Sequence, residues 1–312
     1  PPGAMMNPPM MPEHFNRNMG DVGPSGNRGK VFGQPPPGAM MNPPMMPDQF
    51  NQNQMEGFYP GEQGITEYHD LSSILVDGGD RFGVSALTFD KQDVLWMGNS
   101  GGHVTGYSGL ELQKYTSFQV HMNEDIRQMI PTDRGILSLT RSTLNGSQRR
   151  GLSLFNYKSP AMQEMQCMIM TSPASVLMGG HQTKVIELDL NTMQEMRQVD
   201  VAEPGCAIFR SSTKFICAGD THGKVRLYDP RTLRAEHVLD AHNGTLSDFD
   251  LQGNLLVTCG LSARQNQMMV DRHLMVYDMR VMRAMAPLQI IMDPMFLRFM
   301  NIYNNKLMIV SR

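Results

Sequence analysis

The stretch of sequence that decides the fold is KFICAGDTHGKVRLYD, which covers Lys214–Asp229. It consists of an apolar run, a turn that contains glycine, and a run that alternates polar and apolar residues, an order typical of a β-hairpin. The same order returns in VLWMGNSGGHVTGY (Val94–Tyr107) and in SVLMGGHQTKVIELD (Ser175–Asp189). It returns again in LLVTCG (Leu255–Gly260), which continues after an insertion into DRHLMVYD (Asp271–Asp278).

The spacing of these copies indicates a repeat of about forty residues. Gly98, Gly179 and Gly219 hold equivalent places, separated by 81 and then by 40 residues, and 81 residues is two such repeats. The repeat between them is visible as GILSLT (Gly135–Thr140), a long loop, and GLSLFNY (Gly151–Tyr157). A period of forty residues made of four short strands is typical of the blades of a WD-repeat β-propeller.

We therefore predict an all-β fold, an incomplete WD-repeat propeller of about five blades plus part of a sixth. The five blades are expected at about 84–120, 125–165, 166–204, 206–242 and 245–291. FLRFMNIYNNKLMIVSR (Phe296–Arg312) supplies two strands of the sixth. An open propeller leaves strand edges and one blade face unpaired, so we expect the natural chain to continue beyond Arg312 and the isolated chain to self-associate.

Single residues within the repeat have predicted structural roles. Gly223, and Gly102 at the same place in the first repeat, are expected to take the positive φ that closes a tight hairpin. Thr183 occupies that place in the third repeat, so its turn must differ. The Asp that ends the alternating run, as in Asp189 and Asp229, suits a turn because its carboxylate can accept backbone N–H bonds.

The first 64 residues differ in amino-acid composition from the rest of the chain. They hold 13 of the 20 prolines, and the string PPGAMMNPPMMP occurs at Pro1–Pro12 and again at Pro36–Pro47. Such a segment cannot bury enough apolar surface to offset the entropy lost on ordering. We predict a disordered low-complexity tail at 1–64 and the partial propeller at 65–312. A docking role for the tail stays open, as does a replacement outer strand at Ile65–Val76.

Composition excludes several classes of protein. The formal net charge is −3, from 27 basic and 30 acidic residues, which gives no overall basic field to attract nucleic acid. No apolar run reaches the roughly 18 residues of a membrane span, and no signal peptide opens the chain. The four cysteines are scattered through apolar runs, which favours reduced core thiols in an intracellular protein over disulfides or zinc ligands.

The search for catalytic chemistry finds no site. No phosphate-binding G-x-x-x-x-G-K-[ST] loop occurs. His222 and His103 are expected in or beside solvated turns, and His242 as a structural histidine that hydrogen-bonds within its blade. Asp248 and Asp250 share one face of a strand, but catalysis by paired carboxylates would need further acidic residues nearby. We therefore predict no catalytic, cofactor-binding or metal-binding residue in this chain.

The best candidate for a functional site is the insertion LSARQNQMMVDR (Leu261–Arg272). It is long for a hairpin connection, and adaptable methionine side chains suit a protein interface. The predicted partner-contact loop contains Arg264, Met268, Met269 and Arg272. Arginines are frequent in the later blades, but acidic residues are interleaved with them, which predicts a mixed, solvated surface rather than a nucleic-acid site.

Several longer strings resemble one particular family. YTSFQVHMNEDIRQMI (Tyr115–Ile130), NGTLSDFDLQGNLLVTCGLSAR (Asn243–Arg264) and DRHLMVYDMRVMRAMAPLQI (Asp271–Ile290) are similar to the N-terminal propeller of the catalytic subunit of the poly(A)-nuclease deadenylase complex. MDPMFLRFM (Met292–Met300) continues the similarity, which begins at about Gly83. The tail takes no part in it.

This resemblance implies a seven-bladed propeller that serves as a scaffold in a larger mRNA-decay enzyme. It further implies a kinase-like regulatory subunit as partner and an indirect association with poly(A)-binding protein. A weak contact with RNA is compatible with it, and no association with a membrane is expected. The exonuclease would lie in another domain, with a divalent metal such as Mg²⁺ as its cofactor. The expected location is the cytoplasm, including processing bodies, with room for a nuclear fraction. An unrelated WD-repeat scaffold is the alternative, and a propeller that is itself an enzyme is the weaker one.

Overall fold

The computed structural model describes residues 72–74, 82–264, 267–300 and 306–311. All of them fall within Glu67–Arg312, one of the two compact units into which contacts divide the chain. The predicted tail at 1–64 and most of the proposed strand at Ile65–Val76 lie outside the described residues. The described residues contain strands and turns without a helix. No helix in this part of the chain has the length and apolarity to cross a membrane.

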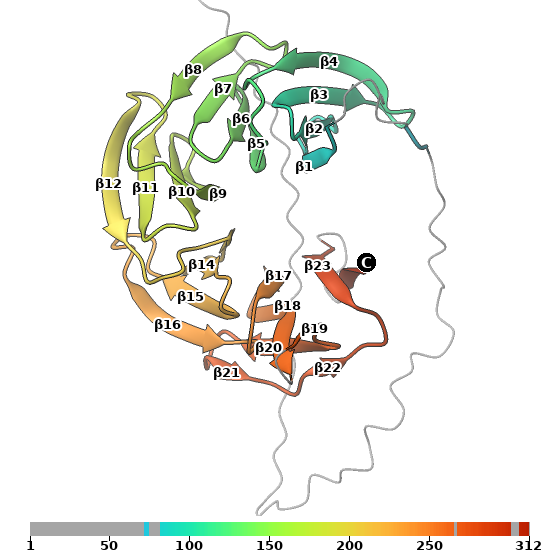
Figure 1. Ribbon diagram of the computed structural model, residues 1–312, viewed down its shortest axis with the longest axis vertical. Coiled ribbons are helices and arrows are strands. Elements are labelled where there is room, and N and C mark those ends of the chain that lie inside the picture. Colours follow the sequence, from blue (N-terminus) through green and yellow to red (C-terminus); the bar gives the residue numbers. More distant parts are fainter. Residues whose placement is uncertain (1–71, 75–81, 265–266, 301–305, 312) are drawn as a thin grey trace, which may run out of the picture. The chain divides into compact units, whose positions relative to one another are not determined.

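The described strands form six antiparallel sheets, each made of strands that follow one another in the chain (Figure 1). The first blade contains β1 (Val84–Phe89), β2 (Leu95–Asn99), β3 (His103–Ser108) and β4 (Gln113–Gln119). The second contains β5 (Gln128–Thr132), β6 (Gly135–Leu139), β7 (Leu144–Ser147) and β8 (Ser153–Tyr157). The third contains β9 (Met165–Ser172), β10 (Ser175–Gly180), β11 (Lys184–Asp189) and β12 (Gln194–Asp200).

The later blades follow the same order. The fourth contains β13 (Ile208–Ser211), β14 (Ile216–Gly219), β15 (Lys224–Tyr228) and β16 (Ala235–Asp240). The fifth contains β17 (Leu246–Gln252), β18 (Leu255–Arg264), β19 (Gln267–Val270), β20 (His273–Asp278), β21 (Arg283–Ala284) and β22 (Leu288–Gln289). The sixth sheet pairs β23 (Pro294–Phe299) with β24 (Leu307–Ser311). The predicted blade boundaries are confirmed.

The apolar core lies between the blades. Five buried clusters occur among the described residues, and each joins two consecutive blades. Between the second and third blades, for example, Leu139 and Leu144 meet Met165 and Ile186, all with side chains at 0% exposure. Burying an aliphatic side chain of this size contributes about 1.5–3 kcal/mol, so most of the stability of each blade depends on its neighbour.

The all-apolar run of the repeat forms the second strand of each blade rather than the innermost one. Every residue of β6, β10 and β14 is buried, because neighbouring blades cover both of their faces. The outermost strand β12 instead alternates exposed and half-buried residues along Gln194–Asp200, as expected for a strand with one face in solvent.

The predicted turn chemistry is confirmed in several repeats. Gly223 and Gly102 have φ of 76° and 83°, whereas Thr183 is not among the described residues with positive φ. The Asp189 carboxylate accepts the backbone N–H of Asn191 at 2.7 Å, and Asp229 accepts that of Arg231 at 3.0 Å. Local hydrogen bonds of this kind end the third strand and turn the chain into the fourth.

One prediction about the second blade is wrong. The stretch between GILSLT and GLSLFNY was expected to be a long loop, but Leu144–Ser147 forms β7, fully buried and paired with β6 and β8. Its sequence LNGS has one large apolar residue, and the hydroxyl of Ser147 is satisfied inside the blade by donating to the Asn145 amide oxygen at 2.7 Å. Sheet pairing and burial override the weak strand propensity of Asn, Gly and Ser here.

The two ends of the arc of blades present apolar side chains to solvent. Leu87 and Phe89 on β1 are 63% and 64% exposed, and Phe296 on β23 is 56% exposed. In the third blade, Met165 on the corresponding innermost strand is fully buried. Figure 1 shows the arc running from β1 round to β23. The described blades thus form the open, incomplete propeller that the repeat count predicts.

Replacing Gly223 with alanine should destabilise the propeller much more than replacing Gly109, which has nearly the same φ of 75°. A Cβ on Gly223 would lie 2.2 Å from the His242 carbonyl oxygen, whereas one on Gly109 would have no neighbour within 4 Å. We expect a loss of about 1–2 kcal/mol for Gly109→Ala from the left-handed conformation alone. Gly223→Ala should cost about 1–3 kcal/mol more, through forced backbone displacement. Urea unfolding of both variants measures the difference, and equal losses would contradict it.

Candidate functional site

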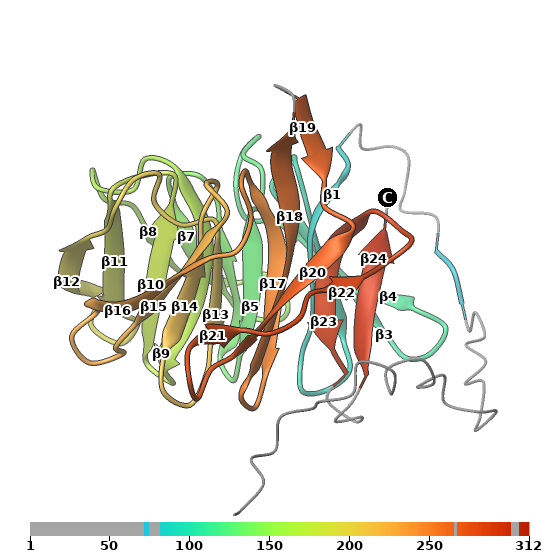
Figure 2. The same cartoon turned by 90° about the horizontal axis from the view of Figure 1, so that it is seen from below.

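The predicted contact loop is a β-hairpin. β18 continues for ten residues, and its outer half pairs with β19 in the register Leu261↔Val270 to Arg264↔Gln267. The other edge of that outer half bonds to the chain before β17, since Leu261 N donates to Thr245 O at 2.7 Å. Figure 2 shows β18 and β19 projecting beyond the other strands at one face of the propeller. The insertion therefore extends the sheet instead of leaving it.

The two methionines of this projecting hairpin face opposite ways. Met268 and Met269 are consecutive on β19, so their side chains leave opposite faces of the strand. They are 50% and 52% exposed. The Met268 side chain lies over Gly244, where its Cε would be 2.6 Å from an added Cβ. A flat partner surface would meet one methionine only, whereas a cleft that clasps the hairpin would meet both.

A buried hydrogen-bond network holds the base of the hairpin in place. His242 Nδ1 lies 2.9 Å from Asp271 Oδ2, and His242 Nε2 lies 2.9 Å from Thr258 Oγ1. A carboxylate only accepts, so Nδ1 donates its proton to Asp271. Ser262 Oγ donates to the same Asp271 oxygen. The prediction that His242 is a structural histidine is confirmed.

The two arginines of the candidate site lie at different places. Arg264 is the last residue of β18, and its Cα pairs with Gln267. Arg272 follows β19, and its Nε bonds to Asp293 Oδ1 at 2.8 Å with both side chains largely exposed. Ile291, 93% exposed, lies two residues before that aspartate. Arg272 thus pairs across to the β22–β23 connection, beside an exposed apolar side chain.

Asp248 and Asp250 connect three blades. Both lie on β17, and both accept backbone N–H groups of β23: Leu297 N at 3.1 Å from Asp248 and Phe299 N at 2.8 Å from Asp250. Asp248 also pairs with Arg210 of β13 at 3.0 Å and with Arg298 of β23 at 2.8 Å. The two carboxylates share a strand face as predicted, and these bonds hold each blade to the next.

The energetics of this ionic cluster follow from its burial. Burial raises the pKa of Asp248, and the neighbouring guanidinium groups of Arg210 and Arg298 oppose that rise. Burial likewise lowers the pKa of Arg210, against the attraction of Asp248. Arg210 also lies over the ring of Phe249, 5.9 Å from its centroid. Charges taken from water in this way stabilise the structure only while each keeps its partner.

The remaining sequence candidates are scattered. His222 is exposed in the β14–β15 turn, and His103 begins β3. Among the residues that the structure describes, no three His, Cys, Asp or Glu side chains come together as a metal-binding group. The four cysteines are all buried and free. Burial raises the pKa of Cys217 and of Cys259 to about 12, so their thiols stay protonated and unreactive at neutral pH.

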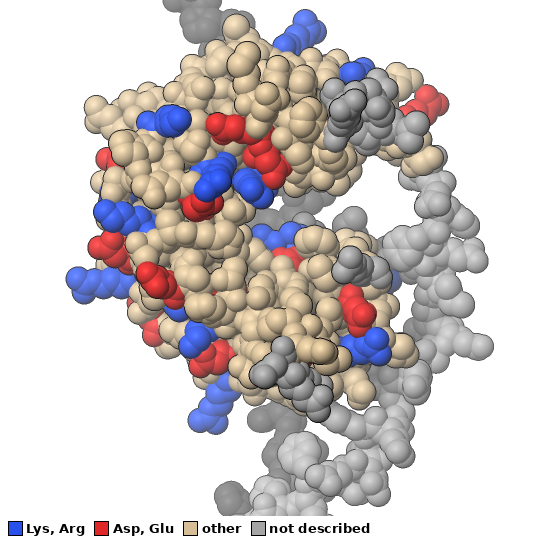
Figure 3. Space-filling model, viewed as in Figure 1, with Lys and Arg blue, Asp and Glu red and all other residues tan. Residues whose placement is uncertain are grey.

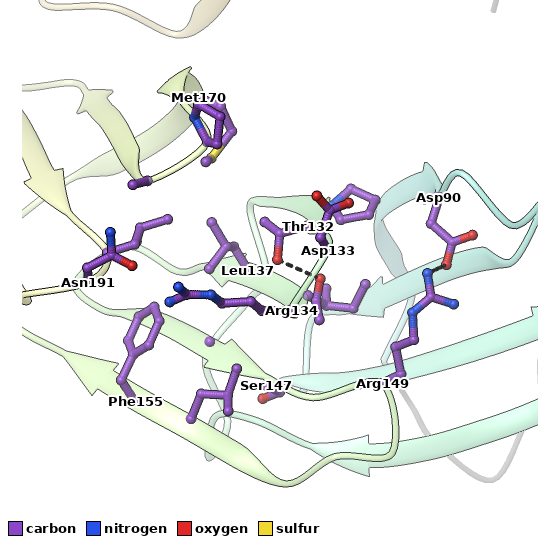
Figure 4. A pocket seen from close by; sticks show the side chains of 18 of the residues that line it. Asp90, Thr132, Asp133, Arg134, Leu137, Ser147, Arg149, Phe155, Met170 and Asn191 are labelled. Carbon is purple, nitrogen blue, oxygen red and sulfur yellow. Dashed lines mark hydrogen bonds and ion pairs between the residues drawn. The ribbon is translucent and has the colours of Figure 1, made fainter. Parts of the chain in front are cut away.

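A hollow of about 930 Å³ lies where turns of the first three blades meet, and the repeat pattern gave no sign of it. Figure 4 shows charged side chains of the first two blades, among them Asp133, Arg134 and Arg149, around a space that Phe155 and Met170 also border. On the face seen in Figure 3, basic and acidic side chains are intermixed, as the sequence predicts.

Comparison with known proteins decides the family. A family model described as PAN2 N-terminal matches residues 64–312. The chain belongs to this family. Its propeller is similar to the Neurospora crassa Pan2 WD40 domain, with a TM-score of 0.72 and 24% identity over 78% of both chains. The computationally designed protein Ika8 is a more distant likeness, with a TM-score of 0.58, 16% identity, and coverage of 74% of this chain and 69% of that one. The WD-repeat fold is thus confirmed.

Two curated relatives carry the same family name. The PAN2-PAN3 deadenylation complex catalytic subunit PAN2 of Gallus gallus is 47% identical over 230 residues, 73% of this chain and 19% of that protein. Its Homo sapiens counterpart is 44% identical over 246 residues, 78% of this chain and 20% of that protein. This chain thus spans about a fifth of the length of these PAN2 relatives. The resemblance found in the sequence is confirmed.

Replacing Asp248 with asparagine should cost about 3 kcal/mol, because the mostly buried charge of Arg210 keeps only the more distant Asp250, 3.9 Å away. Asp293→Asn is the matched control, since it removes a carboxylate from an exposed pair with Arg272. That change should cost less than about 1 kcal/mol. Urea unfolding midpoints measure both losses. If the two variants lose equal stability, the interior ionic cluster does not hold the blades together.

Proposed function

We propose that this chain is the interaction scaffold of a PAN2-type deadenylase subunit, an enzyme that shortens mRNA poly(A) tails from the 3′ end. The family match over residues 64–312 is the observation that carries this proposal. The named relatives are catalytic subunits of a PAN2-PAN3 deadenylation complex. The match favours this interpretation over an unrelated WD-repeat scaffold. Exonuclease chemistry belongs to a part of such a protein outside these residues, so the fragment itself is not the enzyme.

The proposed partners are those that the family resemblance implies, and the relatives' names support the first of them. A kinase-like regulatory subunit, the counterpart of PAN3 in the relatives' names, binds the full-length protein. Poly(A)-binding protein on mRNA tails is reached indirectly, and RNA touches the propeller weakly at most. On the face in Figure 3, acidic and basic side chains are intermixed. This supports weak binding of RNA, because tight RNA binding needs a continuous basic surface.

The proposed cofactor and location concern the whole protein. The proposed cofactor of the exonuclease domain is a divalent metal ion. We propose Mg²⁺, because it commonly assists reactions at phosphate groups. The described residues show no ligand set for it, so no step of the reaction is assigned to them. The protein works in the cytoplasm and in processing bodies, with a nuclear fraction.

The projecting hairpin is the proposed partner-contact site of the scaffold. It extends the sheet beyond the other strands, carries half-exposed methionines on both faces, and is held at its base by the His242–Asp271 network. A rigid base lowers the entropy cost of binding, while unbranched methionine side chains adapt to the partner's surface.

A chimera tests the proposed function. Residues 64–312 would replace the matching region of the human relative in cells that lack that relative. We expect the chimera to restore shortening of the poly(A) tail of a reporter mRNA and to co-purify with PAN3. The control is a chimera that carries an unrelated propeller of equal size. A folded, expressed chimera that restores no more tail shortening than this control would overturn the proposal.

Met268→Ser together with Met269→Ser should reduce capture of a partner by this scaffold without unfolding it. Each residue is half-exposed, so the loss of stability stays near 1 kcal/mol, while the partner loses the apolar contact of whichever face of the hairpin it covers. We expect the amount of partner protein that co-purifies with the chimera through its propeller to be at least fivefold lower with the two substitutions than without them. Met196→Ser, at a 59% exposed position on β12, is the control. Unchanged recovery of every partner would remove the hairpin from the interface.

A further inference from the structure

The hollow over the second blade lies on the opposite face of the propeller from the projecting hairpin. Its rim contains the turns β1–β2, β5–β6 and β9–β10, which join first to second strands. The hairpin leaves the other end of the second strand, between β18 and β20. Strands of one blade run antiparallel, so these two kinds of connection lie at opposite ends of the sheet. The hollow is a separate site from the one proposed above.

The shape of the hollow has an identifiable cause. Gly146 on β7 has no side chain, and the ring of Phe155 occupies the place a Cβ would need, with Cε1 2.3 Å from that position. The ring therefore lies close against β7 and leaves space above it. The volume of about 930 Å³ is at the upper end of the range for ligand-binding pockets in proteins.

The charges of the hollow are balanced except for one. Lys91 Nζ pairs with Asp133 Oδ1 at 3.1 Å, and Arg149 pairs with the buried Asp90 at 2.9 Å. Arg134 also lines the hollow, is exposed, and forms no ion pair with any described residue. The site thus offers one unpaired guanidinium, which can hold a carboxylate through two parallel hydrogen bonds.

The walls around that charge are apolar. Leu154, 44% exposed, and the half-buried Phe155, Met170 and Leu190 line the hollow together with Pro131. Polar residues such as Thr132, Ser172 and Asn191 also line the hollow, and apolar walls with a few polar groups are the usual composition of a site that takes a compact, mainly apolar ligand. A nucleic acid would instead need several unpaired cations to hold its phosphates.

We propose that this hollow docks a short linear peptide of a partner protein, with one carboxylate of the peptide on Arg134 and apolar side chains beside Phe155 and Leu190. Charge complementarity selects the occupant: a peptide with a single Asp or Glu among apolar residues satisfies the guanidinium and the walls together. Because the hollow and the hairpin lie on opposite faces, this peptide and a partner on the hairpin bind without competing.

Peptide binding by the full 312-residue chain tests the proposal. The probe is a fluorescein-labelled array of hexapeptides in which one Asp stands among Leu, Phe and Pro in every order. A matching array carries Asn in place of Asp. We expect anisotropy to show binding of Asp peptides about fivefold tighter than their Asn counterparts. Arg134→Ala should abolish that preference, and Arg134→Lys should keep part of it.

Two variants keep this test specific. Arg150→Ala removes another exposed arginine of the second blade that does not line the hollow, and Met268→Ser with Met269→Ser alters the opposite face. Both should bind the Asp peptides as the unaltered chain does. Absence of binding by every peptide, equal binding of Asp and Asn arrays, or a preference that survives Arg134→Ala would overturn the proposal. Arg134-dependent binding of oligo(A) in place of the peptides would overturn it in favour of RNA.

Discussion

The structure depends on one constraint: the second strand of a blade is buried on both faces, so no blade can be stable by itself. β6, β10 and β14 expose no residue because neighbouring sheets cover them. The five apolar clusters accordingly lie between sheets, each shared by two consecutive blades. Stability is then a sum over neighbouring pairs, and the blades at the two ends of the arc, with Leu87 or Phe296 in solvent, are the least stable.

Polar cross-links supply the alignment that apolar contacts lack. Apolar burial is non-directional and tolerates sliding of one sheet on the next. Asp248 and Asp250 remove that freedom, because their oxygens accept two alternate N–H groups of β23 and fix its register against β17. Within the fifth blade, His242 does the same for the hairpin through Asp271 and Thr258. Asp248 and Asp250, whose spacing resembles that of a catalytic pair of carboxylates, thus have a structural role: they hold neighbouring blades in register.

The repeat made most of the fold predictable. The features that it did not predict depend on contacts between residues far apart in the sequence. Blade limits, the positive φ of Gly223 and the turn-forming aspartates all follow from local sequence. β7 was missed because Asn145–Ser147 resembles a loop, and only pairing on both sides makes it a strand. The insertion after Gly260 is recognisable as a candidate site, but nothing in its sequence indicates that the other edge of its first strand bonds to Asn243 and Thr245, before β17. The hollow joins turns some forty residues apart and leaves no local signal.

The two proposed contact sites lie on opposite faces, an arrangement that would let this propeller hold two partners at once. A scaffold with both sites on one face would force its partners to compete or to touch each other. Here the hairpin of the fifth blade and the hollow of the first three blades are separated by the full length of the strands. The blades between them are joined by buried apolar clusters and the Asp248 ion pairs, so they form a rigid spacer. Two partners bound at these proposed sites would be held on one scaffold at a fixed separation, and neither would block the other.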